Sequence, residues 1–239
     1  MMPRALSLAS VDCFRADGSL MDLARPDPAE VDFAVLAGAL SRIARFSGMP
    51  SGGALSVAQH SVMGAEALLA EGEDELTAAL FLLHDGHEYL IGDKTRPFQA
   101  LLAAVLSDRH GAAIGQALHR AVGDIKAGWD EAIYTAARLP PPSAWTNRQR
   151  MVVEAMDERM VAAESLALFG PKAADGLPLR RRLHLPKLKG AIRPWGPMLA
   201  EERFCALFKK LRGYQLFCDQ KAIHAAHVAA NAPKTAKRG

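Results

Sequence analysis

Two histidines and three carboxylates follow an apolar run in the segment LFLLHDGHEYLIGD, which spans Leu80 to Asp93. A charged group is costly to bury unless it is paired or bound to a metal. His84 and Asp85 are neighbours near the expected end of an apolar helix, and successive helical residues point about 100° apart, so both can reach one ion beside it. Imidazole nitrogen with carboxylate oxygen suits Zn, Mn, Fe, Co or Ni. The segment therefore predicts part of a site for one divalent transition metal.

Further ligands must come from elsewhere, since two ligands hold an ion weakly. His60 is the first candidate because it stands on a helical face that looks like core. Asp157 is the second, because it lies at the edge of an apolar stripe, where a carboxylate needs a partner. Each also has an ordinary interpretation: a lone core histidine is more often simply hydrogen-bonded, and Asp157 could be solvated or pair with Arg150 or Arg159. Only the joint order of the candidates favours a metal site.

Glu88 and His87 complete the chemistry of this segment. Glu88 lies four residues after His84, so on a continuous helix it faces the same ion or hydrogen-bonds to that histidine. A carboxylate there could position or deprotonate a water. His87 falls outside this face, and we expect it to lie in solvent.

The elements that must position these residues are expected to be helices, because Ala, Leu, Glu, Arg and Met dominate the long segments. An all-α fold follows, with a small hairpin at the turn Asp17-Gly18. Ser56 is the expected N-cap of one helix, and Gln59 stands at its capping-box position. The expected helical segments are about 28–46, 56–70, 75–90, 98–106, 109–121, 128–139, 147–169 and 198–227.

The chain reads as one domain over residues 31–230, after an N-terminal arm over 1–30 and before a disordered basic tail over 231–239. Residues 170–197 form a loop excursion rich in proline, glycine and basic residues. The last helix carries an apolar stripe that fits either the core or a homodimer or higher homo-oligomer contact, formed by Phe204, Leu207, Phe208 and Leu211.

Composition argues against several classes of protein. Among 239 residues, 29 basic residues against 26 acidic ones give a net charge of +3, which is too balanced to favour nucleic acid as the main partner. Three cysteines without a CxxC pair favour a reducing cytoplasm. No apolar run approaches the roughly 18 residues of a membrane span, and the first residues lack the apolar core of a secretory signal.

The order His60, His84-Asp85, Asp157 resembles the HD-domain metal-dependent phosphohydrolases, an all-helical superfamily in which H…HD…D binds divalent metal. The resemblance implies an HD-domain helical bundle. It also implies that these four residues are the metal ligands.

The likeness extends to the branch containing bacterial 5′-deoxynucleotidases and phage deoxynucleotide hydrolases of the dATP type. That branch has an Arg-aromatic pair 15 residues before the first histidine, which Arg45-Phe46 matches. Its HD-x-x-E-x-x-x-x-D continuation is matched at Glu88 and Asp93. The resemblance covers roughly residues 34–97 and, more weakly, 152–168.

By resemblance, Glu88 handles the attacking water or the leaving oxygen, Arg45 orients the phosphate and Phe46 packs near the sugar. The turn after Gly92 touches the sugar hydroxyl and supplies the remaining candidate substrate contacts, Asp93, Lys94, Thr95 and Arg96. The chain departs from that branch at two of these candidate substrate contacts. Phe46 stands where the deoxynucleotidases have tryptophan, and this turn is more charged than theirs.

Three functions remain open. A nucleotidase would release phosphate from a (deoxy)nucleoside monophosphate, and this is the hypothesis that we favour. A triphosphohydrolase would act on a deoxynucleoside triphosphate, with Lys94 and Arg96 on the extra phosphates, although both could equally be solvated turn charges. A non-enzymatic nucleotide or nucleic-acid binder on an HD scaffold draws on the basic segment LRRRLHLPKLK and the basic tail.

Overall fold

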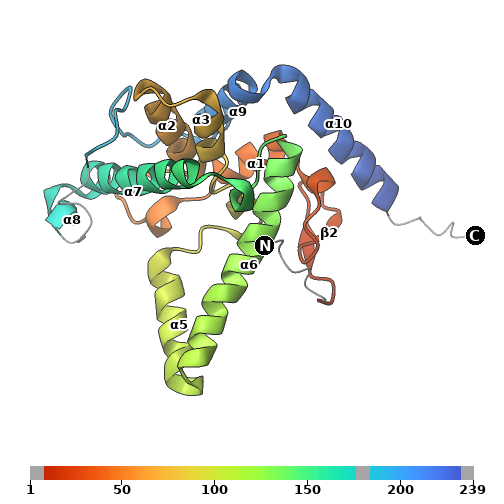
Figure 1. The fold of residues 1–239 in the computed structure, drawn as a ribbon, viewed down its shortest axis with the longest axis horizontal. Helices are drawn as coiled ribbons and strands as arrows, with labels where there is room; N and C mark the ends of the chain where they lie inside the picture. Colours follow the sequence, from red (N-terminus) through yellow and green to blue (C-terminus); the bar gives the residue numbers. More distant parts are fainter. Residues whose placement is uncertain (1–7, 176–183, 233–239) are drawn as a thin grey trace, which may run out of the picture.

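The computed structural model describes residues 8–175 and 184–232 (Figure 1). Within them the chain is predominantly helical, which confirms the all-α prediction, and the strands found there form one small antiparallel hairpin. Its strands are β1 (Asp12–Phe14) and β2 (Leu20–Asp22). The helices are α1 (Phe33–Leu40), α2 (Val57–Ala70), α3 (Glu75–Leu82), α4 (Glu88–Ile91), α5 (Arg96–His110), α6 (Ala112–Ala136), α7 (Asn147–Phe169), α8 (Pro171–Asp175), α9 (Pro197–Arg212) and α10 (Tyr214–Asn231), with 3-10 turns η1 (Pro28–Glu30), η2 (Arg45–Gly48) and η3 (Pro142–Ala144).

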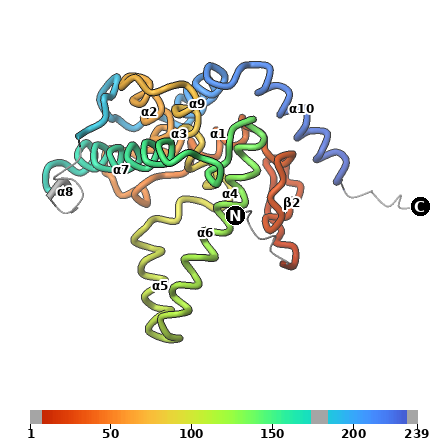
Figure 2. Tube along the Cα trace, in the orientation of Figure 1, coloured from red at the N-terminus to blue at the C-terminus, as the bar shows by residue number. Residues whose placement is uncertain are grey.

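The core lies between α1, α2, α3 and α9, with α7 lying across α2 and α3 (Figure 2). Apolar side chains from these helices and from the end of α6 form one continuous buried cluster. Phe204, Leu207, Phe208 and Leu211 belong to it, and the rings of Phe33 and Phe208 stack with centroids 4.1 Å apart. The stripe on the last helical segment is therefore core and gives no support to a homo-oligomer.

The N-terminal arm packs against the C-terminal half of α6. The hairpin turns at Asp17-Gly18 as predicted, with Cys13 opposite Met21. Met21 is buried beside Trp129, whose indole nitrogen donates to the carbonyl oxygen of Leu23 at 3.1 Å. This contact anchors the arm to the helical body.

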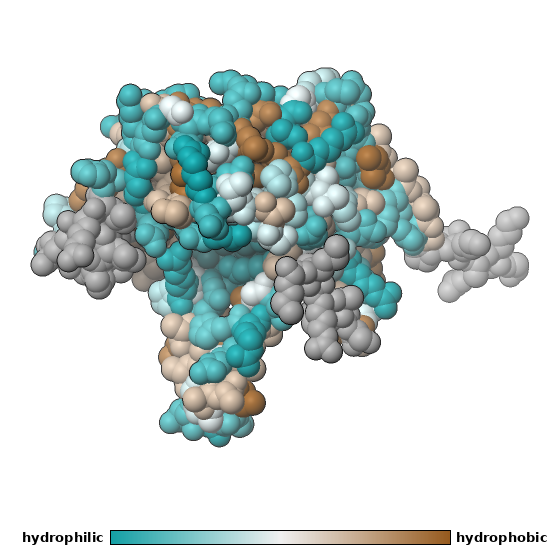
Figure 3. Space-filling view, in the orientation of Figure 1, coloured by the Kyte–Doolittle hydropathy of each residue, from teal (hydrophilic) through white to brown (hydrophobic). Residues whose placement is uncertain are grey.

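Helices α5 and α6 form a hairpin that projects from the body (Figure 1). They approach closely at Gly115, where a Cβ would lie 2.6 Å from the carbonyl oxygen of Ala103. The predicted break between two helices near residue 125 is wrong, since α6 runs unbroken from Ala112 to Ala136. Apolar side chains remain exposed along this hairpin (Figure 3), including Phe98, Leu101, Val105, Ile114 and Ile125.

The first and the last predicted helices differ in extent. The first begins only at Phe33, because the Asp32 carboxylate caps it by accepting from the backbone N–H of Ala34 at 2.7 Å. It ends at Leu40 and does not reach residue 46. The last is split by Gly213, whose φ of 94° is a left-handed conformation that ends α9.

The most consequential difference is in the segment predicted as one helix over 75–90. Helix α3 ends at Leu82, and a tight turn over residues 83–87 separates it from α4. Gly86 makes this turn possible, because a Cβ there would lie 2.9 Å from the carbonyl oxygen of Leu83 and 3.4 Å from the side chain of Ile133. His84, Asp85 and His87 therefore lie on a turn wedged against α6.

Residues 184–196 return to the body after α8. The buried side chain of Gln59 donates to the carbonyl oxygen of Arg193 at 2.8 Å and accepts from the backbone N–H of Trp195 at 2.8 Å. Ser56 caps α2 as predicted, but Gln59 does not close a capping box because its amide holds this segment instead. The rest of the predicted excursion, 176–183, and the tail over 233–239 lie outside the described residues, and no described helix is long and apolar enough to cross a membrane.

Candidate metal centre

Four of the predicted residues converge at one point of the core. His60, His84, Asp85 and Asp157 each offer a nitrogen or oxygen atom within 4.8 Å of the others. The His60 Nε2 atom lies 3.3 Å from His84 Nε2, 3.4 Å from Asp157 Oδ1 and 3.8 Å from Asp85 Oδ2. Four ligands at about 2.1 Å from one ion in a tetrahedron lie roughly 3.4 Å apart. The spacing of the donor atoms thus fits a single transition-metal ion.

Three separate elements supply these side chains. His60 is in the first turn of α2. Ser56 caps this helix, because its hydroxyl oxygen accepts a hydrogen bond from the backbone N–H of Gln59 at 3.1 Å. His84 and Asp85 are on the turn after α3, and Asp157 is near the middle of α7. Packing of α7 across α2 and α3 brings the three together.

The remaining imidazole nitrogens are held by fixed acceptors. His60 Nδ1 lies 2.6 Å from Oε1 of Glu164, which is fully buried on α7. His84 Nδ1 lies 2.7 Å from the carbonyl oxygen of Phe81. Both acceptors require an N–H on Nδ1, so each neutral ring turns the lone pair of Nε2 toward the cluster. Such outer hydrogen bonds are typical of metal-binding histidines.

The ring of Phe81 packs against both imidazoles. Its centroid lies 4.3 Å from that of His84 in a stacked arrangement and 5.7 Å from that of His60. Gly64 on α2 leaves room for this ring, since a Cβ there would fall 2.1 Å from it. The close approach of α2 and α3 therefore restricts how the two ligands can rotate.

The electrostatics of the four groups favour a cation between them. Burial opposes protonation of His84, but the charges of Asp85 and Asp157 outweigh burial and raise its pKa well above the usual value. Burial likewise opposes ionisation of Asp157, but hydrogen bonds from His60 and His84 hold its pKa well below the usual range. In the metal-free protein, imidazolium protons are thus drawn to the position that a cation would take. A divalent ion satisfies both lone pairs and both carboxylates at once.

Arg45 extends the cluster. Its Nε atom donates to Glu164 Oε2 at 3.0 Å, and Nη1 lies 3.5 Å from Asp85 Oδ2. Burial disfavours its charge, but Glu164 and Asp85 outweigh burial and raise the pKa of the guanidinium.

Phe46 and Ser47 both have left-handed backbone, at φ 54° and 53°. Such conformations cost about 1–3 kcal/mol each and cluster at functional sites.

Phe46 is half-buried beside the cluster. Its ring lies edge-on to that of Phe169 at 5.5 Å, and the Arg45 guanidinium carbon lies 5.7 Å from its centroid. The predicted Arg-aromatic pair therefore lies next to the candidate metal ligands, which it contacts through Arg45.

Glu88 begins α4 and is buried next to Asp85. Because a turn separates it from His84, the helical spacing used to predict its position was wrong. Burial first, and then the charges of Asp85 and Asp93, raise the pKa of Glu88 to about 8. Burial also raises the pKa of Asp93, while Arg45 and Lys126 on α6 oppose these shifts.

The charged turn before α5 lies at the edge of the cluster. Arg96 donates to Asp157 Oδ2 at 3.1 Å, although 75% of its side chain is exposed. Asp157 thus pairs with Arg96, while Arg159 binds Glu71 and Arg150 binds the carbonyl oxygen of Pro142. Lys94 is exposed, and Thr95 is half-buried at the N-cap position of α5.

His87 is not in solvent, contrary to prediction. Only 4% of it is exposed, because the turn that replaces the helix directs it toward α6. There its Nδ1 lies 2.8 Å from Asp130 Oδ1. It forms a second group of potential ligands with Asp85 and Glu88.

Sequence reasoning missed Glu164, Phe81, Lys126 and Asp130. Glu164 alone had a usable signal, since it lies seven residues after Asp157, and two helical turns place both on one face. The other three depend on the turn after α3 and on how α6 packs.

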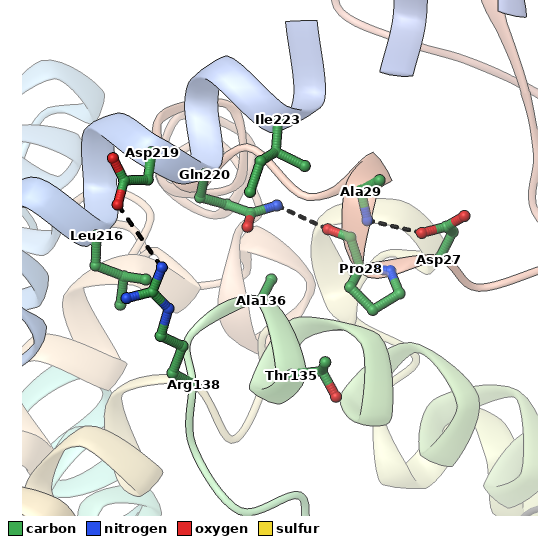
Figure 4. A pocket seen from close by; sticks show the side chains of 10 residues that line it. All are labelled: Asp27, Pro28, Ala29, Thr135, Ala136, Arg138, Leu216, Asp219, Gln220 and Ile223. Carbon is green, nitrogen blue, oxygen red and sulfur yellow. Dashed lines mark hydrogen bonds and ion pairs between the residues drawn. The ribbon is translucent and has the colours of Figure 1, made fainter. Parts of the chain in front are cut away.

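A separate cavity of about 330 Å³ lies between η1, α6 and α10, away from these ligands (Figure 4). Gln220 lines it and donates to the carbonyl oxygen of Pro28 at 2.7 Å, while Arg138 lies 3.7 Å from Asp219. Gln220, Arg138 and Asp219 therefore already have polar partners among the residues that line this cavity. It offers none of the histidines of the cluster.

No family model matches the chain. An uncharacterized protein of Rhodobacter capsulatus is 36% identical to it over 104 residues, which are 41% of this chain and 53% of that protein. The match therefore spans about half of the relative's length.

Proposed function

We propose that this chain is a divalent-metal-dependent phosphohydrolase of the HD-domain type, acting on nucleotides. The most specific form of the proposal is hydrolysis of the 5′-phosphate of (deoxy)nucleoside monophosphates. One observation carries it: two imidazoles with fixed Nε2 lone pairs and two carboxylates converge next to a buried guanidinium.

A bound ion would supply Lewis acidity, neutralising phosphate charge and lowering the pKa of water. Arg45 would bind the phosphate, because a planar guanidinium matches two phosphate oxygens and stabilises charge that grows on them. Its Nε is occupied by Glu164, which fixes the direction in which the two Nη groups point.

Glu88 would hold and transfer the proton. With a pKa near 8, its carboxyl group can take a proton from water or give one to the leaving oxygen near neutral pH. Asp93 and the following turn would contact the sugar, and Phe46 would pack against it.

The second candidate is a deoxynucleoside triphosphate triphosphohydrolase. It is favoured by Arg96, a mostly exposed cation at the edge of the cluster that could leave Asp157 for a phosphate. The exposed Lys94 would add a second charge.

A metal and product analysis separates these functions. Purified protein is stripped with chelator, reloaded with Mn²⁺, Co²⁺ or Zn²⁺, and incubated with a panel of nucleoside mono- and triphosphates. We expect metal-dependent release of inorganic phosphate from monophosphates. Release of triphosphate from triphosphates would support the second candidate, and bound nucleotide with neither product would indicate a non-enzymatic binder. Failure to bind metal would contradict the whole proposal.

A further inference from the structure

Two buried polar atoms beside the proposed metal centre lack a hydrogen-bond partner. They are Nε2 of His87 and Oε2 of Glu88, on side chains that are 4% and 6% exposed. A buried polar atom without a partner costs about 1–3 kcal/mol, so such atoms are rare unless something binds them. Both belong to the group of three residues, with Asp85, whose ligand atoms lie within 4.8 Å of one another.

Asp130 determines which His87 nitrogen faces this group. An ionised carboxylate only accepts hydrogen bonds, so the 2.8 Å contact requires an N–H on Nδ1 of His87. In the neutral ring, Nε2 then carries the lone pair. A carboxylate that binds the outer nitrogen while the other nitrogen faces a cation is the usual arrangement around a metal-binding histidine.

Asp85 can serve both groups of ligands. Its contacts with His84, His60 and Arg45 all use Oδ2. Its second oxygen, Oδ1, takes part in none of them. A carboxylate that offers one oxygen to each of two cations is a common bridge, and bridged ions lie about 3.5–4 Å apart.

We infer that Asp85, His87 and Glu88 form a second divalent-cation site, bridged through Asp85 to the ion held by His60, His84 and Asp157. One nitrogen and two carboxylate donors suit a transition ion such as Mn²⁺ or Zn²⁺. The role of this ion rests on the proposed phosphohydrolase function, because two bridged ions hold the attacking and leaving oxygens of a phosphate ester. Its binding does not depend on that function. When the second ion is bound, Glu88 is one of its ligands, so the proton-transfer role of Glu88 applies to the chain that holds one ion.

The test is the number of Mn²⁺ ions that the full-length, chelator-stripped protein binds, measured by equilibrium dialysis and electron paramagnetic resonance. The wild type is expected to bind two ions per chain, with a signal per ion weaker than that of an isolated Mn²⁺ because neighbouring ions couple. The variants His87→Gln and Glu88→Gln are each expected to bind one. Asp130→Asn is expected to weaken the second ion about 10–100-fold. His119→Gln, an exposed histidine of α6, is the matched control and keeps two.

One uncoupled ion in the wild type overturns the second site, and this needs no variant. If that ion disappears in His60→Gln, the proposed metal centre stands without it. Two ions that persist in folded His87→Gln and Glu88→Gln, checked by circular dichroism, also overturn it. No bound ion in the wild type contradicts the proposed function as well.

Discussion

Imidazoles meet buried carboxylates in two regions that are built differently. At the edge, Glu30 binds the Arg15 guanidinium at 2.5 Å, while His227 from α10 lies 3.0 Å from the same carboxylate. In the centre, two imidazoles direct Nε2 atoms toward each other at 3.3 Å, and two carboxylates face the same point. Around Glu30, hydrogen-bond donors surround an acceptor. In the candidate metal centre, lone pairs of acceptors point toward one another.

The two clusters therefore have different roles. The Glu30 carboxylate is already paired within its own cluster. Burial opposes ionisation of Glu30, but hydrogen bonds from Arg15 and His227 outweigh burial and lower the pKa of Glu30. It joins the arm to the last helix and stabilises the fold. The central cluster balances its charge only by taking up protons or a cation, which is the arrangement of a binding site.

The largest expected effect is that of Asp85→Ala. Since Asp85 lies near both histidine Nε2 atoms, its removal should abolish metal binding at the centre and lower turnover at least about 10³-fold, while the helical circular dichroism signal persists. Metal analysis and phosphate release measure this, with the exposed Asp124→Ala as control. Full activity in Asp85→Ala would end the account of the centre as a metal site.

Glu88→Gln comes next. It should lower turnover about 10²–10³-fold, the typical range for loss of a general acid or base, and retain the ion held by the histidines. Loss of that ion would instead make Glu88 one of its ligands. Measuring the metal content of the pre-loaded variant beside its rate separates the two outcomes.

Glu164→Gln should have an intermediate effect. The residue touches no proposed substrate atom, but it holds His60 Nδ1 and Arg45 Nε. We expect metal affinity to fall about 10–100-fold. Glu154→Gln on the exposed face of α7 is the matched control, and equal affinities for the two variants would show that the hydrogen bond to His60 is irrelevant to the ion.

The smallest expected effect is that of a substitution in the Glu30 cluster. Glu30→Gln should lower the free energy of unfolding by about 1–3 kcal/mol without changing metal affinity, since hydrogen bonds to a charged group are lost. The pKa of Glu30 is lowered from 4.5, so its contribution is present above that pH and is lost as pH falls through the folded-state pKa. Urea titrations at pH 7 and at a series of lower pH values should therefore show a difference between variant and wild type that shrinks as the pH falls below 4.5. A difference that stays constant as the pH falls would contradict this origin.

Local signals were enough to predict much of the fold. Helix formers and an N-cap such as Ser56 are encoded within a few residues, and α2 and α7 follow the predicted limits. The convergence of His60, His84, Asp85 and Asp157 was also predicted, because their types and order carry the chemistry, and their role as metal ligands stays a prediction.

Features that depend on tertiary packing could not be predicted. The turn after α3 depends on contact between Gly86 and Ile133, which a helical pattern does not reveal. That turn buries His87, which sequence reasoning had placed in solvent. HD-domain membership and nucleotide specificity stay predictions.

The central claim is that the four ligands surround one ion. Crystals grown with Mn²⁺ should show an anomalous difference peak in contact with His60 Nε2, His84 Nε2, Asp85 and Asp157, whatever the second group binds. No peak there, with His60 and His84 still 3.3 Å apart, would contradict it.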